Sequence, residues 1–405
     1  MMMKRLFLTA CLSVLTAGCA AQATTPASKA CVAPGTWYDP ARNTNLSNAD
    51  VLNRIEDLDV VLLGETHTDQ DHHLWQLQTI AQLYAKRPNL VLGFEAFPRR
   101  VQGVLDQWVA GKLSEAEFLK QSDWNTVWKF DPKLYMGLFH FARINHVPMI
   151  ALNVDKSLTK KVSNMGWKAV PKDQRLGLSD PIAPSQAYLN MLEHVYGLHD
   201  NGKGKDKPDL KDDPRFAGFV DVQVTWDRAM AEAIAGALQK EVPPQVVTIV
   251  GRGHVEYGYG IPHQLSHLGI EKVSVLTPWE DVRPCSDLKD ESGKTVANAV
   301  FGLTLAQDAQ AAPKPKLGVM IAPAKDGGVH ISGVLKTSVG DVSGLLKDDI
   351  ITMAAGQPVN TTEELVRIIQ SISPGMWLPL TIKRGEETKD LIARFPAKPT
   401  QKKHP

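Results

Sequence analysis

Short apolar runs alternate with longer segments of helical spacing between residues 37 and 284. The runs with the length of buried strands are Val60–Leu63, Leu90–Leu92, Val147–Val154 and Val246–Val250. Apolar residues recur every three or four positions in the segments 74–84, 132–144 and 216–238, which are predicted to be helices. Strands that alternate with helices predict an α/β fold with a mainly parallel sheet flanked by helices.

Two of the predicted strands end in the same motif, Gly-x-x-His. The motif is Gly64-Glu65-Thr66-His67 after the first run and Gly251-Arg252-Gly253-His254 after the last, and Gly93-Phe94-Glu95 follows the run at 90–92. Functional groups of an open α/β sheet gather at the carboxyl ends of its strands. We therefore expect Glu65, His67, Glu95 and His254 to share one cleft.

The first residues have the pattern of an export signal. Lys4 and Arg5 precede an apolar stretch from Leu6 to Leu15, and Ala17-Gly18 stand directly before Cys19. The segment resembles a bacterial lipoprotein signal, which implies that residues 1–18 are removed and that Cys19 carries lipid and anchors the chain to a membrane. Residues 19–36 are then a tether, and Ala20 favours the outer membrane, facing the periplasm. An ordinary signal peptide that is cleaved nearby is the alternative.

Composition narrows the remaining possibilities. Lys and Arg number 45 against 44 Asp and Glu, so the net charge is close to zero and does not favour nucleic acid as a partner. Once Cys11 and Cys19 are set aside, Cys31 and Cys285 remain, and in an exported protein they are expected to form a disulfide. Two free thiols are the alternative.

The last quarter of the chain resembles a PDZ domain. Residues 286–315 are small and polar and are predicted to be a linker, and residues 397–405 to be a tail. The resemblance covers 316–396 and includes Val329–Val334, Gly344–Ile351 and the helix at 362–370, although Asp348 replaces the usual Gly. It implies a small α+β domain that binds protein C-termini by strand addition at Leu317, Gly318, Val319, Met320 and Ile321. A module used only for packing is the alternative.

The remaining motifs carry a second resemblance. Gly64–His67 with His72-His73, Gly93–Phe97, Gln223–Ala231 and Gly253–Pro262 occur in the order seen in the ChaN family of haem-binding lipoproteins, in the superfamily of TIKI metalloproteases and erythromycin esterases. The resemblance covers about residues 45–278 and implies that a domain at 37–285 binds haem through a tyrosine between two subunits, in haem and iron uptake. Tyr257 is the first choice of iron ligand and Tyr259 the second. His67, His72 and His254 are expected near the haem, and haem binding is expected to bring two copies together.

Two other functions stay open. Members of the same superfamily are hydrolases, so Glu65, His67, Glu95 and His254 would form a catalytic site that activates water or holds a divalent metal. No Gly-x-Ser-x-Gly motif supports a serine hydrolase. Alternatively, the first domain is inactive and the PDZ domain is the functional part. We prefer the haem-binding protein to the enzyme.

Overall fold

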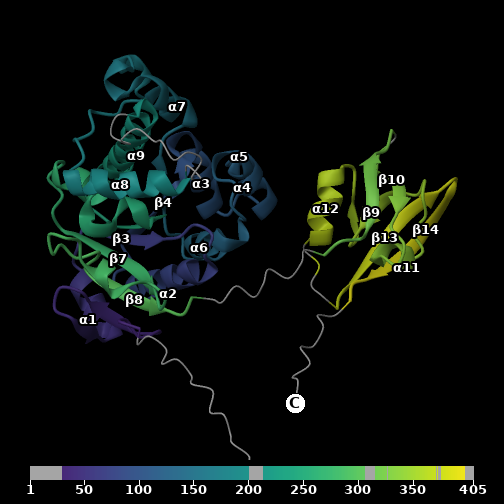
Figure 1. Ribbon diagram of the computed structural model, residues 1–405, viewed down its shortest axis with the longest axis horizontal. Coiled ribbons are helices and arrows are strands. Elements are labelled where there is room, and N and C mark those ends of the chain that lie inside the picture. The colour runs from purple at the N-terminus through teal and green to yellow at the C-terminus, as the bar shows by residue number, and fades with distance from the viewer. Residues whose placement is uncertain are drawn as a thin grey trace, which may run out of the picture. The chain divides into compact units, whose positions relative to one another are not determined.

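The computed structural model describes residues 30–199, 213–305, 315–325, 327–370, 372 and 375–396. The chain divides into two units, the first ending at Leu305 and the second beginning at Ala306 (Figure 1). The predicted signal peptide, the lipidation site Cys19 and the tail at 397–405 lie outside the described residues. No helix in the described ranges is both long and apolar enough to cross a membrane.

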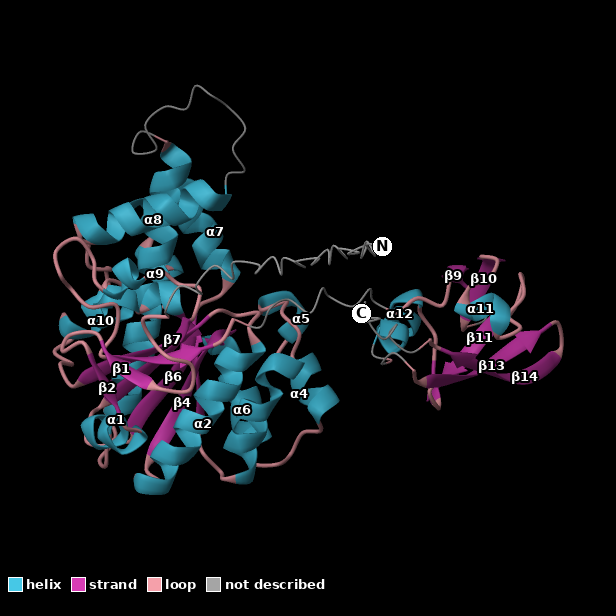
Figure 2. Cartoon of the chain, turned by 60° about the horizontal axis from the view of Figure 1, so that its bottom comes forward, coloured by secondary structure: helices cyan, strands magenta, loops and turns pink. Residues whose placement is uncertain are grey.

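The first unit is built on an eight-stranded, mainly parallel sheet, which confirms the predicted fold class (Figure 2). Its strand order is β2-β1-β8-β7-β3-β6-β4-β5. The strands β3 to β8 run parallel to one another, and β1 runs antiparallel to β8 and β2. The strands are β1 (Trp37–Asp39), β2 (Thr44–Leu46), β3 (Val60–Glu65), β4 (Leu90–Pro98), β5 (Met149–Asn153), β6 (Gln245–Gly251), β7 (Val273–Glu280) and β8 (Ala299–Leu303).

Helices cover both faces of this sheet, because the apolar side chains of its strands alternate between the faces. In β3, Val61 and Leu63 pack with α2 and α6, whereas Val60 and Leu62 pack with α9 and α10. The helices are α1 (Asn48–Ile55), α2 (Gln70–Lys86), α3 (Gln102–Val109), α4 (Glu115–Gln121), α5 (Trp124–Val127), α6 (Lys133–Ile144), α7 (Lys156–Met165), α8 (Gln186–His199), α9 (Pro214–Leu238) and α10 (Ile261–Ser266). Short 3₁₀ helices are η1 (Arg99–Val101), η2 (Trp167–Ala169), η3 (Lys172–Gln174), η5 (Arg252–His254), η6 (Glu256–Gly258) and η7 (Cys285–Leu288).

The first unit is longer at both ends than the sequence predicted. Residues 286–305, expected to belong to the linker, include η7 and the strand β8, which lies inside the sheet between β7 and β1. Residues 30–36, expected to belong to the tether, pack on the same unit, because Val32 is buried and Gly35 donates a backbone hydrogen bond to Gly302. These contacts correct both predicted boundaries.

Cys31 and Cys285 are neighbours, but they are free thiols rather than the predicted disulfide. A hydrogen bond with the Cys31 thiol raises the pKa of the Cys285 thiol. The packing of residues 30–36 on the domain brings Cys31 to Cys285, so the chain supplies the proximity that a disulfide requires.

Two glycines of α9 allow a test of its packing. Gly218→Ala should destabilise the protein by about 1–3 kcal/mol, because the added Cβ would lie 2.4 Å from the carbonyl oxygen of Ser163 on α7. Gly236→Ala is the matched control: no atom lies within 4 Å of the added carbon, so helix propensity should make it stabilising by about 0.5–1 kcal/mol. Urea unfolding of both variants measures the difference, and equal effects would contradict the contact with α7.

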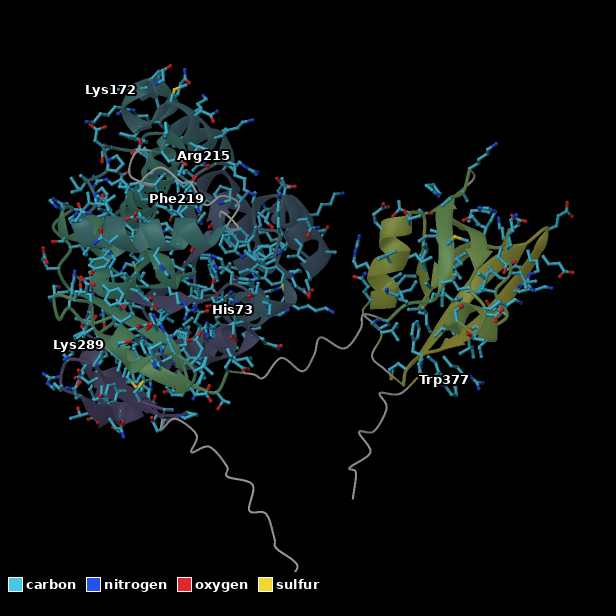
Figure 3. The ribbon with its side chains drawn as sticks, in the orientation of Figure 1. His73, Lys172, Arg215, Phe219, Lys289 and Trp377 are labelled. Carbon is cyan, nitrogen blue, oxygen red and sulfur yellow. The ribbon has the colours of Figure 1, made fainter. Side chains whose placement is uncertain are left out.

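The second unit has an antiparallel sheet in the order β14-β13-β11-β10-β9. Its elements are β9 (Val319–Pro323), β10 (Val329–Val334), β11 (Ile350–Ala354), β12 (Gln357–Pro358), β13 (Trp377–Arg384), β14 (Glu387–Arg394), α11 (Val339–Val342) and α12 (Thr362–Gln370). Figure 3 shows Trp377 of β13 projecting from this unit, and Arg394 stacks on its ring with a separation of 4.7 Å.

The loop before β9 has the geometry that its sequence predicted. Gly318 has φ +75°, and a Cβ there would lie 2.3 Å from Cβ of Ser338, so only glycine fits. Asp348, the residue that replaces the usual Gly, also has positive φ (74°), as expected for a residue that tolerates the left-handed region. The neighbouring Asp349 is buried and accepts two hydrogen bonds from Arg384, at 2.7 and 2.8 Å. β9 is the edge strand of the sheet and has one free side.

Candidate functional site

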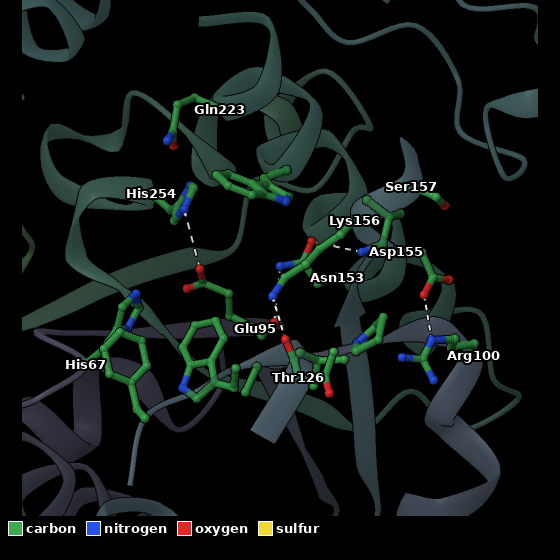
Figure 4. A pocket seen from close by; sticks show the side chains of 17 residues that line it. His67, Glu95, Arg100, Thr126, Asn153, Asp155, Lys156, Ser157, Gln223 and His254 are labelled. Atoms are coloured by element: carbon green, nitrogen blue, oxygen red, sulfur yellow. Dashed lines mark hydrogen bonds and ion pairs between the residues drawn. The ribbon is translucent and has the colours of Figure 1, made fainter. Parts of the chain in front are cut away.

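A cavity of about 480 Å³ lies at the carboxyl ends of β3, β4, β5 and β6 (Figure 4). His67, Glu95 and His254 line it, as the sequence predicted for a shared cleft. Glu65 lies behind His67 rather than on the cavity wall. The other lining residues are Ala96, Pro98, Arg100, Thr126, Val127, Trp128, Phe130, Asn153, Val154, Asp155, Lys156, Ser157, Gln223 and Trp226.

His67 is oriented by the carboxylate of Glu65. Its Nδ1 donates to Oε1 of Glu65 at 2.7 Å, and the hydroxyl of Tyr135 donates to the same oxygen at 2.9 Å. Burial alone would lower the pKa of His67, but the hydrogen bond to Glu65 and the charge of Glu95 outweigh burial and raise it. Since Nδ1 is occupied, Nε2 is the nitrogen that His67 can offer to a ligand.

Glu65 is itself a buried anion. Burial would raise the pKa of its carboxyl, but hydrogen bonds from His67 and His73 outweigh burial and lower it to about 2. Nε2 of His73 lies 3.0 Å from Oε2 of Glu65. Glu65 is therefore charged at any physiological pH.

The low pKa of Glu65 predicts a loss of stability in acid. The unfolded carboxyl has the ordinary value of 4.5. Its contribution of about 3 kcal/mol is present above that pH and is lost as the pH falls toward 2. In urea unfolding between pH 2.5 and 6, Glu65→Gln should flatten this part of the pH dependence, whereas the exposed control Glu291→Gln should leave it unchanged. A Glu65→Gln curve as steep as that of the wild type would contradict the assignment.

His254 has a matching arrangement on the other side of the cavity. Its Nδ1 donates to Oδ1 of Asp227 at 2.7 Å, and the hydroxyl of Tyr188 donates to Oδ2 of Asp227 at 2.8 Å. Burial would lower the pKa of His254, but Glu95 and Asp227 outweigh burial and raise it to about 9. His254 is therefore a buried imidazolium at neutral pH.

Glu95 lies between the two histidines. Its Oε1 is 3.6 Å from Nε2 of His254, and its Oε2 accepts a hydrogen bond of 2.7 Å from the backbone N–H of Gly251. A Cβ on Gly251 would lie 2.9 Å from Cε1 of His67 and 3.4 Å from Oε2 of Glu95. The glycine of the second Gly-x-x-His motif thus lets His67 and Glu95 approach the strand closely.

Each histidine of the cavity therefore belongs to a buried chain of three groups, tyrosine hydroxyl, carboxylate and imidazole. Such a carboxylate fixes the orientation of the imidazole and stabilises its charged form. The walls around the histidines are aromatic, because Trp128 packs edge-on against His67 at 4.6 Å and Trp226 packs edge-on against His254 at 6.2 Å. The arrangement suits proton transfer to, or polar recognition of, a ligand with a flat apolar part.

His72 and His73, predicted at the same rim, are both buried. Nδ1 of His72 accepts a hydrogen bond of 2.9 Å from the backbone of Thr66, and its Nε2 lies 3.3 Å from Glu280. The structure thus places His72 among groups of the protein, behind the cavity.

The two predicted tyrosines lie at a different place from the cavity. The Tyr257 hydroxyl donates to the Asp287 carbonyl at 2.7 Å, and the Tyr259 hydroxyl donates to the Asp290 carboxylate. Tyr257 is half-buried beside a hollow of about 260 Å³ that Gly258, Pro262 and Lys294 also line, whereas Tyr259 is buried. Burial and the neighbouring Glu256 raise the pKa of Tyr257 to about 12. The structure therefore does not bring the tyrosines together with Glu65, His67, Glu95 and His254.

Among the described residues, no group of three or more His, Cys, Asp or Glu side chains is arranged to hold a metal ion. Nδ1 of each cavity histidine is hydrogen-bonded to a carboxylate, which leaves Nε2 as the ring nitrogen open to a ligand. The described residues thus show no ligand cluster for the divalent metal of the hydrolase hypothesis.

Sequence reasoning gave no role to three of the groups behind the histidines, which are Tyr135, Tyr188 and Asp227. Asp227 is fully buried, and it stands among apolar positions of α9 that include Val224, Met230 and Ala231. An ionisable residue on the buried face of an amphipathic helix is costly unless it is paired. That position in the helical pattern was the one signal that could have identified it.

The family models that match this chain fall separately on its two units. A family model described as haem-binding uptake, Tiki superfamily, ChaN matches residues 51–265, and a PDZ domain model matches residues 315–393. A solved structure described as cofacial heme binding to ChaN of Campylobacter jejuni is 17% identical, with a TM-score of 0.50, and the match covers 65% of this chain and 95% of that one. At this identity the likeness establishes the fold alone.

Smaller matches fall on protease PDZ domains. The HtrA3 PDZ domain bound to a phage-derived ligand is 21% identical over 20% of this chain and 84% of that one, with a TM-score of 0.19. A serine endoprotease from Yersinia pestis is 16% identical over 20% of this chain and 28% of that one, with a TM-score of 0.18. No curated protein matches the chain.

Proposed function

Because the chain belongs to the ChaN family of haem-binding uptake proteins in the Tiki superfamily, we propose that it is a haem-binding protein with an appended peptide-binding PDZ domain. The family match over residues 51–265 is the observation that carries this proposal. Haem would supply a ferric iron that takes one axial ligand from the protein. The role in haem and iron uptake is part of the proposal.

Tyr257 is the iron ligand that the chemistry of this chain favours. A phenolate is an established axial ligand of haem iron. Of the two tyrosines in the loop, Tyr257 is half-buried beside an open hollow, whereas Tyr259 is buried. To bind iron, the Tyr257 hydroxyl must give up its proton and its hydrogen bond to the Asp287 carbonyl. The side of the haem that this shallow hollow leaves open would be covered by a second copy of the chain.

The location of the protein is likewise proposed. Acylation of Cys19 would anchor the chain to the outer membrane, with both domains in the periplasm. Metabolic labelling with a palmitate analogue tests this anchor, and it should label the wild type but leave Cys19→Ala unlabelled. Equal labelling of both would contradict lipidation at Cys19.

The PDZ domain is proposed to bind protein C-termini. β9 is an edge strand, and Gly318 in the loop before it has a positive φ and no room for a side chain, which supports the proposal that the backbone of this loop receives a peptide carboxylate. A peptide with an apolar C-terminal residue should bind residues 316–396 of the full chain, and its amidated form should bind at least about tenfold more weakly, since the amide removes the charge that the backbone N–H groups recognise. Fluorescence anisotropy measures both peptides, and equal affinity would contradict carboxylate recognition.

Haemin titration of the mature chain tests the main proposal. We expect a saturable shift of the Soret band, a high-spin ferric charge-transfer band and a doubling of the mass in size-exclusion chromatography with light scattering. The spectrum of free haemin and an unchanged monomer mass would contradict it.

A hydrolase is the second candidate function, and the chains Tyr135–Glu65–His67 and Tyr188–Asp227–His254 are the observation that favours it. An imidazole oriented by a carboxylate is the usual general base of a hydrolase, a role open to His67, whereas His254, charged at neutral pH, would serve as a general acid. In a screen of ester and peptide substrates, turnover that is lost in both His67→Ala and His254→Ala would support this function. Turnover that persists in both variants would contradict it.

A further inference from the structure

The two cysteines of the first unit lie next to the segment that covers Tyr257. We call residues 285–296 the strap; Lys289, near its middle, is seen at the periphery of the first unit in Figure 3. The strap begins with η7, in which Cys285 and Ser286 are exposed, and turns back at Asp290–Lys294. Cys31 is half-buried beside it, with Sγ 4.0 Å from the carbonyl oxygen of Arg283.

The strap accepts three hydrogen bonds from the Tyr257 loop. Its Asp287 and Val296 carbonyls accept hydrogen bonds from the hydroxyl and the backbone N–H of Tyr257, the second at 2.8 Å. Its Asp290 carboxylate accepts a hydrogen bond from the Tyr259 hydroxyl. Just before the strap, Arg283 forms two hydrogen bonds of 2.7 and 3.0 Å with Glu256, the residue next to Tyr257.

The two ends of the strap are held differently. Leu288 and Val296 are buried in the core of the domain and fix the body of the strap. The turn at 285–288, which carries the Asp287 carbonyl, is exposed at its first two residues, and its outer contact is with Cys31. Leu288 stays anchored in the core, so movement of residues 285–287 alone would release the Tyr257 hydroxyl without unfolding the domain.

We propose that Cys31 and Cys285 form a reversible disulfide that locks the 285–288 turn on Tyr257, so that the thiol form accepts haem more readily than the disulfide form. The effect on haem affinity rests on the proposed haem function, whereas the disulfide that holds the turn on Tyr257 does not. With the disulfide closed, the turn is tied to residues 30–36 and cannot withdraw the Asp287 carbonyl from the phenol. With the thiols free, the turn can move away, and the phenol oxygen becomes available to iron.

The redox step needs a two-electron partner, and glutathione disulfide supplies one. The exposed Cys285 thiolate attacks glutathione disulfide, forms a mixed disulfide and releases one glutathione. Cys31 thiolate then attacks Sγ of Cys285 and releases the second glutathione. Two S–H bonds are lost, the Cys31–Cys285 bond forms, and one disulfide is reduced to two thiols.

The experiment compares the mature chain oxidised with glutathione disulfide, the same chain reduced with a phosphine, and the double variant Cys31→Ser/Cys285→Ser. Intact mass should show the loss of two hydrogens in the oxidised form. Nitration of Tyr257 by tetranitromethane and hydrogen exchange at 285–288, both read by peptide mass spectrometry, should be several-fold faster in the reduced chain and in the variant. The PDZ domain provides an internal control whose exchange should not change.

Haemin affinity, measured for the oxidised chain and the double variant without reductant, should be about tenfold higher in the variant. Failure of the disulfide to form, or a disulfide form with unchanged nitration and exchange, would overturn the lock. A difference in nitration and exchange with no haemin binding by either form would support the lock and contradict the haem function. If the double variant does not fold, the reduced wild type still gives the nitration and exchange rates.

Discussion

Tyr257→Phe is expected to lower haemin affinity by roughly 100-fold, or about 3 kcal/mol, and to remove the charge-transfer band of the ferric complex. The change deletes only the oxygen that would bind iron, and it leaves the aromatic ring against the second core of the domain, where Tyr257 packs. The lost hydrogen bond to Asp287 should reduce stability by only about 1 kcal/mol. Haemin titration followed by absorption spectroscopy measures the first effect, and urea unfolding the second.

Tyr259→Phe is the matched control for this prediction. Tyr259 is two residues away, its ring stacks on that of Tyr257 at 5.4 Å, and its hydroxyl binds the same strap through Asp290. The control should keep the charge-transfer band. Loss of the band in Tyr259→Phe but not in Tyr257→Phe would identify Tyr259 as the iron ligand. Retention of the band in both variants would point to a histidine as the ligand.

Asp227→Ala is expected to destabilise the first domain by about 3–5 kcal/mol, because it removes the partner of a buried charge. Asp227 is fully buried, and its two oxygens accept hydrogen bonds from His254 and Tyr188. Without this carboxylate, the pKa of His254 should fall from about 9 toward or below the ordinary 6.5. Urea unfolding measures the stability, and NMR titration of the histidine ring measures the pKa.

The raised pKa of His254 also predicts how the stability of the first domain changes with pH. The pKa of His254 is raised in the folded protein, so its stabilising contribution is present below about pH 6.5 and is lost as the pH rises through 9. The decline should be smaller in Asp227→Ala. Tyr188→Phe is the control, since it removes one hydrogen bond to Asp227 and should cost only about 1 kcal/mol. An Asp227→Ala variant as stable as Tyr188→Phe, with His254 still titrating near 9, would contradict the pairing.

The sequence pattern predicted those strands and helices whose residues form the element by themselves. The strands β3, β4 and β6 each contain a short apolar run, and α9 has apolar residues at helical spacing, so each could be recognised by itself. The shared cleft of His67, Glu95 and His254 followed from topology, because the ends of neighbouring parallel strands meet.

The rest depends on contacts between residues far apart in the sequence. The partner of His254 is Asp227 on a helix, and the partner of Tyr257 is a backbone carbonyl, which no side-chain pattern records. The strap has the small, polar composition of a linker, so the strand β8 that follows it was assigned to the linker, although Val300–Leu305 has the pattern of an edge strand. The family resemblance placed Tyr257 and His254 near one haem, whereas the structure separates the tyrosine from the cavity.

The position of β8 has a consequence for how the first domain is made. β8 is the last strand of the domain in sequence, yet it lies between β7 and β1, and it joins Phe301 to Trp37. A chain that is synthesised or translocated from its amino end cannot complete this sheet until β8 is available. The sheet of the first domain therefore stays incomplete while most of the domain has already been made. A fragment that stops at residue 285 would leave the edge of β7 unpaired and β1 without its neighbour, and we expect it to aggregate.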